Sequence, residues 1–529
     1  MRRLLSVLLL TCLCGFSLHA QNGAIITRNA AKIARALYYI ETRYVDTVDM
    51  DKAIDKMLES LVEQLDPHSA YIPKDRVEET NEPLESSFEG IGIEFAIVAD
   101  TLTVQSVIVG GPSEAVGLRP GDRIMAIDGE NIAGVGLTNN GVRDRLRGPK
   151  GSQVVVTVRR GDLQQDFVIR RDTIPLTSVD AAYMTDSDIL YVKFSRFAQN
   201  TASELVKTMT DVPLRKPRGM IIDLRGNGGG FMQVAVILAD IFLEKGQTIV
   251  RTEGNGINHE ERASGMGFYQ KGPVVVLVDE YSASASEIVA GALQDWDRAV
   301  IVGRRTFGKG LVQQQYPLPD GAEMRLTVAR YHTPSGRVVQ SPYEMGQRDA
   351  YYRQARERYD HGESFSLDSI ALPDSLRFRT LKLGRPVYGG GGIIPDVFVP
   401  YDTTGMNRFL IKVIGSGALQ DYAYDYLDRH REDLAAKDIV SFEKAYAPFA
   451  GEAFDGLLAY CAGKGLEPES DGEVAACTPI LKTRLKALVA RGILGTTGYW
   501  QVINREEDPE FQRALEIVEN WKDAFPIAP

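Results

Sequence analysis

The spacing of apolar residues changes along the chain, and each spacing predicts a different kind of structure. Between residues 24 and 82, apolar positions recur every three or four residues, which predicts two helices. Between residues 88 and 172, short β-branched runs are separated by Gly and Pro turns. This pattern predicts a small β-rich domain with one helix near Asn140–Leu146. The apolar positions of the first two helices are Ile33, Leu37, Ile40, Tyr44, Ile54, Leu58, Leu61 and Leu65.

Predicted strands alternate with predicted helices from residue 173 to 335. Apolar runs at Gly219–Leu224 and Val274–Asp279 predict buried strands, and helical patterns follow each of them, at Met232–Leu243 and Ser286–Gln294. This alternation is typical of a layered α/β domain whose central strands are covered by helices.

Two further stretches complete the chain. Residues 341–385 are polar, rich in Tyr and Arg and weakly periodic, which favours a long surface insertion. The tail from about residue 405 returns to helical spacing, and Asp508-Pro509-Glu510 is a typical start signal for its last helix.

The first twenty residues differ from the rest. Arg2 and Arg3 precede an apolar run, Leu4–Leu18, and Ala20 offers a small residue for cleavage before Gln21. This order is typical of a secretory signal peptide. The run is shorter than the ~20 residues that span a bilayer, so we expect no stable membrane span. We therefore expect an exported protein of the bacterial periplasm or cell envelope, with the signal peptide cleaved near Ala20.

Length and charge narrow the class of protein. A chain of 529 residues is too long for one core and predicts three or four domains. The net charge of −11 argues against a nucleic-acid partner, which would need a basic face, and against adhesion to an anionic membrane.

Cysteines and histidines give little support to a metal site. Cys12 and Cys14 fall within the signal peptide, where the preceding residues fit a lipid-attachment site poorly. Cys461 and Cys477 could pair in an oxidising compartment or stay as separate buried thiols, and the sequence leaves both alternatives open. The six histidines are far apart and form no HExxH motif, so we expect no metal and no cofactor.

A candidate nucleophile lies between an apolar strand and an amphipathic helix, within residues 274–295. The small residues 282–286 allow a sharp turn that leaves the Ser284 hydroxyl at a helix N-terminus, where N–H groups favour a developing anion. Serine hydrolases place their nucleophile in such a turn. On this segment alone, N-cap roles for Ser284 and Ser286 explain the pattern better.

Two glycine-rich loops could complete a catalytic site. The glycines of residues 223–230 let N–H groups converge on an anion, either a nucleotide phosphate or an oxyanion shared with the helix start at Ala285. The Lys-Ser/Thr pair of a Walker loop is missing. In residues 306–313, glycines flank Lys309, and an extended segment puts Lys309 and Gln313 on one face. Burial lowers a lysine pKa by as much as about 3–5 units, which would make Lys309 a base; the alternative is a surface lysine in a turn.

Taken together, three motifs closely resemble the C-terminal-processing (tail-specific) peptidases of the S41 serine peptidase family. They are LRGNGGG at 224–230, SASASE at 282–287 with an aspartate eight residues later, and TFGKGLVQ at 306–313. The resemblance implies Ser284 as nucleophile, Lys309 as its base and Gln313 as the group that orients the lysine. It also implies the N–H groups of Ala285 and Gly229 as oxyanion donors. The resemblance also implies that Glu287, Asp295 and Thr306 have supporting roles around the catalytic residues.

The resemblance extends to a PDZ domain upstream. Phe88–Phe95, with Gly111-Pro112 and Gly121–Ile124, looks like a PDZ carboxylate-binding loop and its following strand. A Gly-Ile-Gly-Ile turn can offer bare N–H groups to a terminal carboxylate, and the next strand can pair with an extended peptide. The peptide-binding residues implied are Gly90, Ile91, Gly92 and Ile93.

The sequence therefore predicts an α/β protein with a layered S41, crotonase-like peptidase core, an inserted β-rich PDZ domain and helical regions at both ends. Its expected partners are protein or peptide substrates with exposed C-termini, and a homo-oligomer is compatible with the sequence. An inactive PDZ scaffold on the same fold is the main alternative, and an acyl-CoA enzyme of the crotonase type is a weaker one. The expected segments are a signal peptide (1–20), an N-terminal helical region (21–87), the PDZ domain (88–172), the catalytic domain (173–404) and a C-terminal helical region (405–529).

Overall fold

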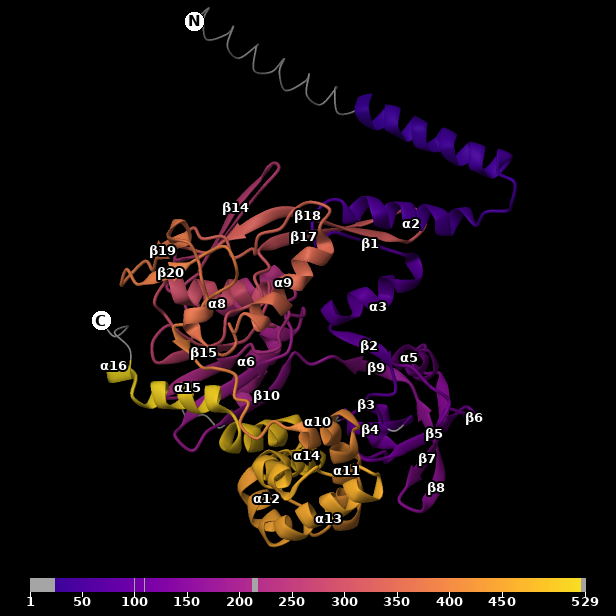
Figure 1. Cartoon of the computed structure of the whole chain (residues 1–529), viewed down its shortest axis with the longest axis vertical. Helices are drawn as coiled ribbons and strands as arrows, with labels where there is room; N and C mark the ends of the chain where they lie inside the picture. Colours follow the sequence, from indigo (N-terminus) through magenta and orange to yellow (C-terminus); the bar gives the residue numbers. More distant parts are fainter. Residues whose placement is uncertain (1–23, 99, 109, 212–216, 525–529) are drawn as a thin grey trace, which may run out of the picture. The chain divides into compact units, whose positions relative to one another are not determined.

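The computed structural model describes most of the chain and divides it into two compact units (Figure 1). The predicted signal peptide, residues 1–20, lies outside the described residues. The described ranges are 24–98, 100–108, 110–211 and 217–524. The first unit contains residues up to 77 with 315–326 and 344–348, and the second contains 78–314, 327–343 and 349–529.

The first unit is mainly helical, as predicted. Residues 24–43 form one helix and α2 (Met50–Glu63) forms the next. Helix α2 begins after Asp49 because the Asp49 carboxylate accepts a hydrogen bond from the Lys52 N–H (3.1 Å). Strand β1 (Ala70–Ile72) pairs antiparallel with residues 323–325. Helix α3 (Val77–Asn81) lies at the junction with the second unit.

A six-stranded sheet forms the centre of the second unit. Its order is β10-β11-β12-β15-β16-β21, and all neighbours are parallel except β10 and β11. Every residue of β11, β12, β15 and β16 is buried, which explains their continuous apolar runs. The strands are β10 (Val179–Met184), β11 (Ile189–Phe194), β12 (Gly219–Asp223), β15 (Val274–Val278), β16 (Val300–Gly303) and β21 (Val397–Phe398).

Helices cover both faces of this sheet, so the predicted layered α/β core is confirmed. Alternate strand residues such as Val192 and Val276 pack with α7 and α8 in one core cluster, while Ile221 and Val275 pack against α15 in another. The helices are α6 (Thr201–Asp211), α7 (Met232–Asp240), α8 (Ala285–Asp295) and α15 (Pro509–Glu519).

A smaller β-rich domain precedes this core. Its sheet has the order β3-β4-β5-β7-β8, with β6 beside β5, and β3 lies at the edge of the path. A separate pair, β2 with β9, joins the start and the end of the domain. The elements are β2 (Ser87–Gly90), β3 (Ile93–Val98), β4 (Thr101–Val107), α4 (Pro112–Ala115), β5 (Arg123–Ile127), β6 (Glu130–Asn131), α5 (Asn139–Leu146), β7 (Gln153–Arg160), β8 (Leu163–Arg170) and β9 (Asp172–Pro175).

The segment between β16 and β21 contains more structure than the sequence predicts. Within the predicted surface insertion, α9 (Arg348–Asp360) buries Tyr351, whose hydroxyl donates to the carbonyl oxygen of Gly308 (3.2 Å). Most residues of this helix are exposed, as expected for a surface insertion, and Tyr351 anchors it to the loop that carries Lys309. The remaining strands are β13 (Thr248–Gly254), β14 (Ile257–Arg262), β17 (Leu311–Pro317), β18 (Glu323–His332), β19 (Arg377–Arg379) and β20 (Pro386–Tyr388).

The tail forms the predicted helices around a core of its own. Cys461 and Cys477 are free, buried thiols in that core, and burial raises the pKa of Cys461 to about 11. The long helix α14 is interrupted at Gly495, whose φ of 70° is not helical. These helices are α10 (Arg408–Gly415), α11 (Ala418–His430), α12 (Ile439–Tyr446), α13 (Ala450–Gly463), α14 (Asp471–Glu506) and α16 (Trp521–Ala524).

Two searches of the described residues bear on membranes and metals. None of the described helices is long and apolar enough to cross a membrane. Within the same residues, no three His, Cys, Asp or Glu side chains are grouped so that they could hold a metal ion.

Candidate active site

Ser284 occupies a strained turn between β15 and α8. Its φ of 55° and ψ of −111° lie in a region that residues other than glycine rarely adopt. The small neighbours of the SASAS sequence make this sharp strand-to-helix turn sterically feasible. Nucleophilic serines of other hydrolases sit in turns of this kind, where the hydroxyl is presented at the start of a helix. Ser284 is half-buried.

One buried carboxylate brings the Ser284 turn and the Lys309 loop together. Glu287 lies in the first turn of α8 and has no exposed surface. Its Oε2 accepts hydrogen bonds from the N–H groups of both Ser284 (2.9 Å) and Lys309 (2.8 Å). Its Oε1 accepts from the Thr306 hydroxyl (2.5 Å) and the Gly308 N–H (2.8 Å). The amide nitrogens of residues 284 and 309 are therefore no more than about 6 Å apart.

Tyr331 holds the same two residues from their carbonyl ends. Its hydroxyl lies 3.1 Å from the carbonyl oxygen of Ser284 and also within hydrogen-bond distance of the carbonyl oxygen of Lys309. Tyr331 comes from β18 and is almost completely buried. Sequence reasoning missed this residue, because nothing in the motif spacing indicates which strand packs behind the loop.

The Lys309 side chain contacts Gln313, as the two-residue period of an extended segment predicts. The Lys309 ammonium donates to Gln313 Oε1 (3.0 Å), and Lys309 is half-buried. The flanking glycines are needed for the close packing of this loop. A Cβ on Gly308 would lie 2.2 Å from Ser341 Oγ, and a Cβ on Gly310 would lie 2.6 Å from the Gln340 nitrogen.

The glycine loop packs directly against the nucleophile turn. A Cβ on Gly229 (φ 104°) would lie 2.9 Å from the Ser284 Cβ and 3.0 Å from the Ala285 nitrogen. The Gly229 N–H itself donates to Asn227 Oδ1 (2.9 Å). An anion at this position would therefore have to compete with Asn227 for the Gly229 N–H. Ala285 is the first residue of α8, where the N–H groups have no partner within the helix.

Asn227 was not predicted and organises this loop. It is fully buried, its side-chain amide donates to the Phe194 carbonyl (3.0 Å), and its own carbonyl accepts from the Ala283 N–H (3.0 Å) and the Ser286 hydroxyl (2.9 Å). The signal available in the sequence was a single amide side chain inside a run of glycines.

The supporting residues act at different places. The Thr306 hydroxyl donates to Glu287 and accepts from the Ile393 N–H (2.6 Å), so it lies at the site. Asp295 lies at the other end of α8, roughly 16 Å along the helix from Ser284. There it forms a fully buried ion pair with Arg337 (2.7 Å) and accepts a hydrogen bond from the Ser335 N–H (2.9 Å). Asp295 therefore supports the scaffold, and the structure does not bring it to the Ser284 group, by which we mean Ser284, Lys309, Gln313, Glu287 and Thr306.

Burial changes the pKa of the Glu287 carboxyl group. Complete desolvation raises its pKa to about 7, although the four hydrogen bonds oppose the rise. Because the folded pKa lies above the ordinary value of 4.5, the folded protein holds this proton longer than the unfolded chain.

The contribution of Glu287 to stability should therefore be complete below pH 4.5 and lost as the pH rises through about 7. The expected loss for this group is about 3 kcal/mol. Urea unfolding of the Ser284→Ala protein, measured from pH 5 to 8.5 with and without Glu287→Gln, isolates the effect. If the free energy of unfolding changed with pH in the same way in both proteins, the assigned contribution of Glu287 would be wrong.

The glycine loop is also tied to the last helices. The Arg225 guanidinium binds Asp223 (2.7 Å), Asp508 (2.6 Å) and Glu510 (3.2 Å), and all four side chains are at least largely buried. The neighbouring charges of Arg225 and Lys193 hold the pKa of Asp223 below its ordinary value despite desolvation by burial. Asp508 also caps α15 by accepting from the Phe511 N–H (2.9 Å).

Replacing Arg225 with alanine should lower the free energy of unfolding by about 3–5 kcal/mol, because it removes the cation that three buried carboxylates share. The matched control is Arg513→Ala, which removes a half-exposed arginine from α15 and should change stability by no more than about 0.5 kcal/mol. Urea denaturation and hydrogen exchange in α15 measure both. Equal stability of the two variants would show that the buried cluster contributes nothing.

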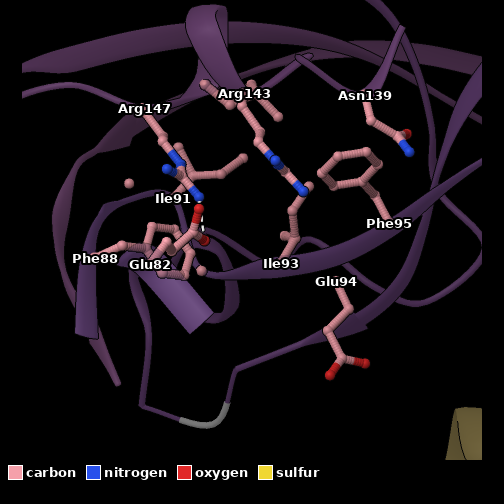
Figure 2. Close-up of a pocket in the computed structure, with 12 residues that line it drawn as sticks. Glu82, Phe88, Ile91, Ile93, Glu94, Phe95, Asn139, Arg143 and Arg147 are labelled. Carbon is pink, nitrogen blue, oxygen red and sulfur yellow. Dashed lines mark hydrogen bonds and ion pairs between the residues drawn. The ribbon is translucent and has the colours of Figure 1, made fainter. Parts of the chain in front are cut away.

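The predicted peptide-binding residues lie in a pocket that is separate from Ser284 and Lys309. Gly90, Ile91, Gly92 and Ile93 line a pocket of about 300 Å³ between β3 and α5 (Figure 2). None of the residues that line it belongs to the Ser284 group. The structure therefore forms two distinct sites from the predicted residues.

Comparison with known proteins shows the family of the chain. The model of peptidase family S41 matches residues 188–343, a PDZ domain model matches 103–160, and the model of a family of unknown function matches 409–495. A carboxy-terminal-processing protease of Bartonella bacilliformis is 35% identical over 332 residues, which is 61% of this chain and 75% of that protein.

Two further relatives extend the comparison. Carboxy-terminal processing protease CtpB of Bacillus subtilis is 34% identical over 313 residues, 58% of this chain, and the chain spans just under two thirds (65%) of its length. The solved structure of a photosystem II D1 C-terminal processing protease is 26% identical, with 69% of this chain and 85% of that chain covered and a TM-score of 0.36. The chain belongs to the carboxy-terminal-processing proteases of peptidase family S41 and carries a PDZ domain.

Proposed function

We propose that this chain is an exported serine endopeptidase that captures substrate tails in its PDZ groove and cleaves them with a Ser284–Lys309 dyad. The single observation that carries the proposal is the shared carboxylate of Glu287, which binds the backbone of the Ser284 turn and of the Lys309 loop with one oxygen.

The proposed reaction forms an acyl-enzyme. The Lys309 amine takes the proton of the Ser284 hydroxyl as Oγ bonds to the carbonyl carbon of the substrate. The resulting oxyanion is stabilised by the Ala285 N–H and by the Gly229 N–H, once Asn227 has released the latter. The carbon–nitrogen bond then breaks, and the Lys309 ammonium gives its proton to the leaving amine. Water, deprotonated by the Lys309 amine, then attacks the ester. The Ser284 oxygen leaves and takes back a proton from Lys309, which restores the enzyme.

Gln313, Thr306 and Glu287 act as positioning residues in this proposal. Gln313 accepts a hydrogen bond from Lys309 Nζ and so orients the amine, while Thr306 and Glu287 hold the loop backbone. Export follows from residues 1–20 and requires cleavage near Ala20.

A serine-directed fluorophosphonate probe tests the function against an inactive PDZ scaffold. Under the proposal, the probe labels the mature protein on Ser284, the Lys309→Met variant reacts far more slowly, and Ser284→Ala takes up no label. A wild-type protein that takes up no label and leaves unstructured polypeptides intact would favour the inactive scaffold.

A further inference from the structure

We propose that the PDZ groove selects tails that carry an acidic side chain two residues before an apolar C-terminal residue, and that Arg143 reads this acid. The inference rests on the proposed tail capture and names the class of tail that the groove prefers. It follows from the edge position of β3, the register between strand and helix, and the charges that face the pocket.

The groove can accept a peptide as an additional strand. Strand β3 pairs with β4 on one side, and no described strand pairs with its other side. A tail laid against that free edge gains main-chain hydrogen bonds, and its carboxylate reaches the turn at Gly90–Ile93. Ile93 and Phe95 of β3 provide an apolar wall, and Leu146 of α5 faces them across the pocket.

Arg143 of α5 and Arg147, the residue that caps its C-terminus, are spaced like alternate side chains of an added strand. Arg143 and Arg147 both line the pocket and are one helical turn apart, about 6 Å. Alternate side chains of a strand are about 6.6 Å apart and lie on the same face. When the last side chain of a tail lies at the level of Leu146 and Arg147, the third from last therefore lies at the level of Arg143.

Of these two arginines, Arg147 already has a firm partner. It binds the Glu82 carboxylate, and its guanidinium lies 4.9 Å from the centre of the Phe88 ring. Both side chains of this ion pair are largely buried, at 22% and 17% exposure. Separating them would leave a poorly hydrated charge on each side, so we expect Arg147 to stay with Glu82.

Arg143 is held much more loosely. Its closest acid is Glu79 of the preceding segment at 3.4 Å, and the two side chains are 38% and 46% exposed. Exposed pairs of this kind contribute little to stability, so exchanging Glu79 for a carboxylate of the tail costs little. In Figure 2, Arg143 extends from α5 into the space above Ile93 and Phe95, where a bound tail would lie.

The remaining acid of the pocket wall does not compete. Glu94 points away from the arginines in Figure 2, and its carboxylate accepts from Ser106 Oγ (2.7 Å) and from Arg491 of α14 (2.7 Å). Once a tail has displaced the exposed Glu79 carboxylate, the charge that it meets at Arg143 is positive. A carboxylate at that position is favoured, and an ammonium is disfavoured.

The test uses full-length Ser284→Ala protein and fluorescent peptides that differ only in the third residue from the C-terminus: Glu, Gln or Lys. Fluorescence anisotropy at low salt should give about fivefold tighter binding for Glu than for Gln, and weaker binding again for Lys. Arg143→Ala should make the three peptides bind alike, and Arg143→Glu should reverse the order. Arg143→Lys should keep it.

The matched control is Arg145→Ala, which removes an arginine from the same helix that pairs with Glu130 and does not line the pocket. Arg145→Ala should leave the preference for Glu peptides unchanged. An equal effect of Arg145→Ala and Arg143→Ala would overturn the proposal in favour of bulk charge.

C-terminally amidated peptides distinguish the acid preference from tail capture itself. If amidation weakens binding but Glu, Gln and Lys peptides bind alike, the acid preference is wrong and tail capture stands. If amidated and free tails bind equally, tail capture itself fails.

Discussion

Ser284→Ala should reduce peptide turnover by about 10⁴-fold or more, and Lys309→Met should do the same, while both proteins keep their fold. Nucleophile and base act as one unit, so removing either member removes most of the chemistry that the pair provides. Neither substitution disturbs the backbone bonds to Glu287, because these come from the N–H groups of residues 284 and 309.

Steady-state kinetics on an unstructured polypeptide, together with thermal denaturation, measure this effect. The double variant should be no slower than either single variant, because residues that act as a unit are not additive. Gln313→Ala provides a graded comparison and should retain more activity, since Gln313 orients the Lys309 amine and does not itself accept the serine proton. Wild-type rates in Ser284→Ala would remove the residue from the mechanism.

Glu287→Gln should lower kcat/KM by about 10²-fold or more. In its ionised form, above its pKa of about 7, the Glu287 carboxylate accepts four hydrogen bonds, two on each oxygen. An amide has one accepting oxygen, and its NH₂ group would face two donors, so one pair of bonds must break. Either choice moves the Ser284 turn, the Lys309 loop or both, and displacements near 1 Å cost about this much in rate.

Glu287→Asp and Glu244→Gln complete this experiment. Glu287→Asp keeps the four acceptor sites on a shorter side chain, so it should retain more activity than the amide if the variant is folded. Glu244→Gln changes an exposed carboxylate that lies 3.9 Å from Lys382 and should leave kcat/KM unchanged. A folded Glu287→Gln protein with full activity would contradict the positioning role.

The sequence predicted the core, and it pointed to candidate residues that the structure brings close together, because those signals are local. Glycines beside Lys309 and the tiny residues around Ser284 describe backbone that must turn or pack closely, and the structure uses them in that way. The continuous apolar strands and the helices between them could also be predicted, because apolar residues recur with different spacing in strands and helices.

What could not be predicted depends on long-range packing. Tyr331 comes from a strand whose place behind the Lys309 loop no motif records. Helix α9 is charged and carries little apolar periodicity, so Tyr351, which anchors it, was not visible as a core residue. The binding of Arg225 by Asp508 likewise arises only when distant segments meet.

A crystal structure of the mature enzyme after reaction with a peptidyl phosphonate would test the Ser284–Lys309 pair most directly. The proposed mechanism predicts a phosphorus–oxygen bond at Ser284 Oγ, the phosphonyl oxygen facing the Ala285 N–H, and the Lys309 nitrogen within about 3.2 Å of Ser284 Oγ. An adduct on another residue, or a Lys309 ammonium turned away from Ser284, would contradict it.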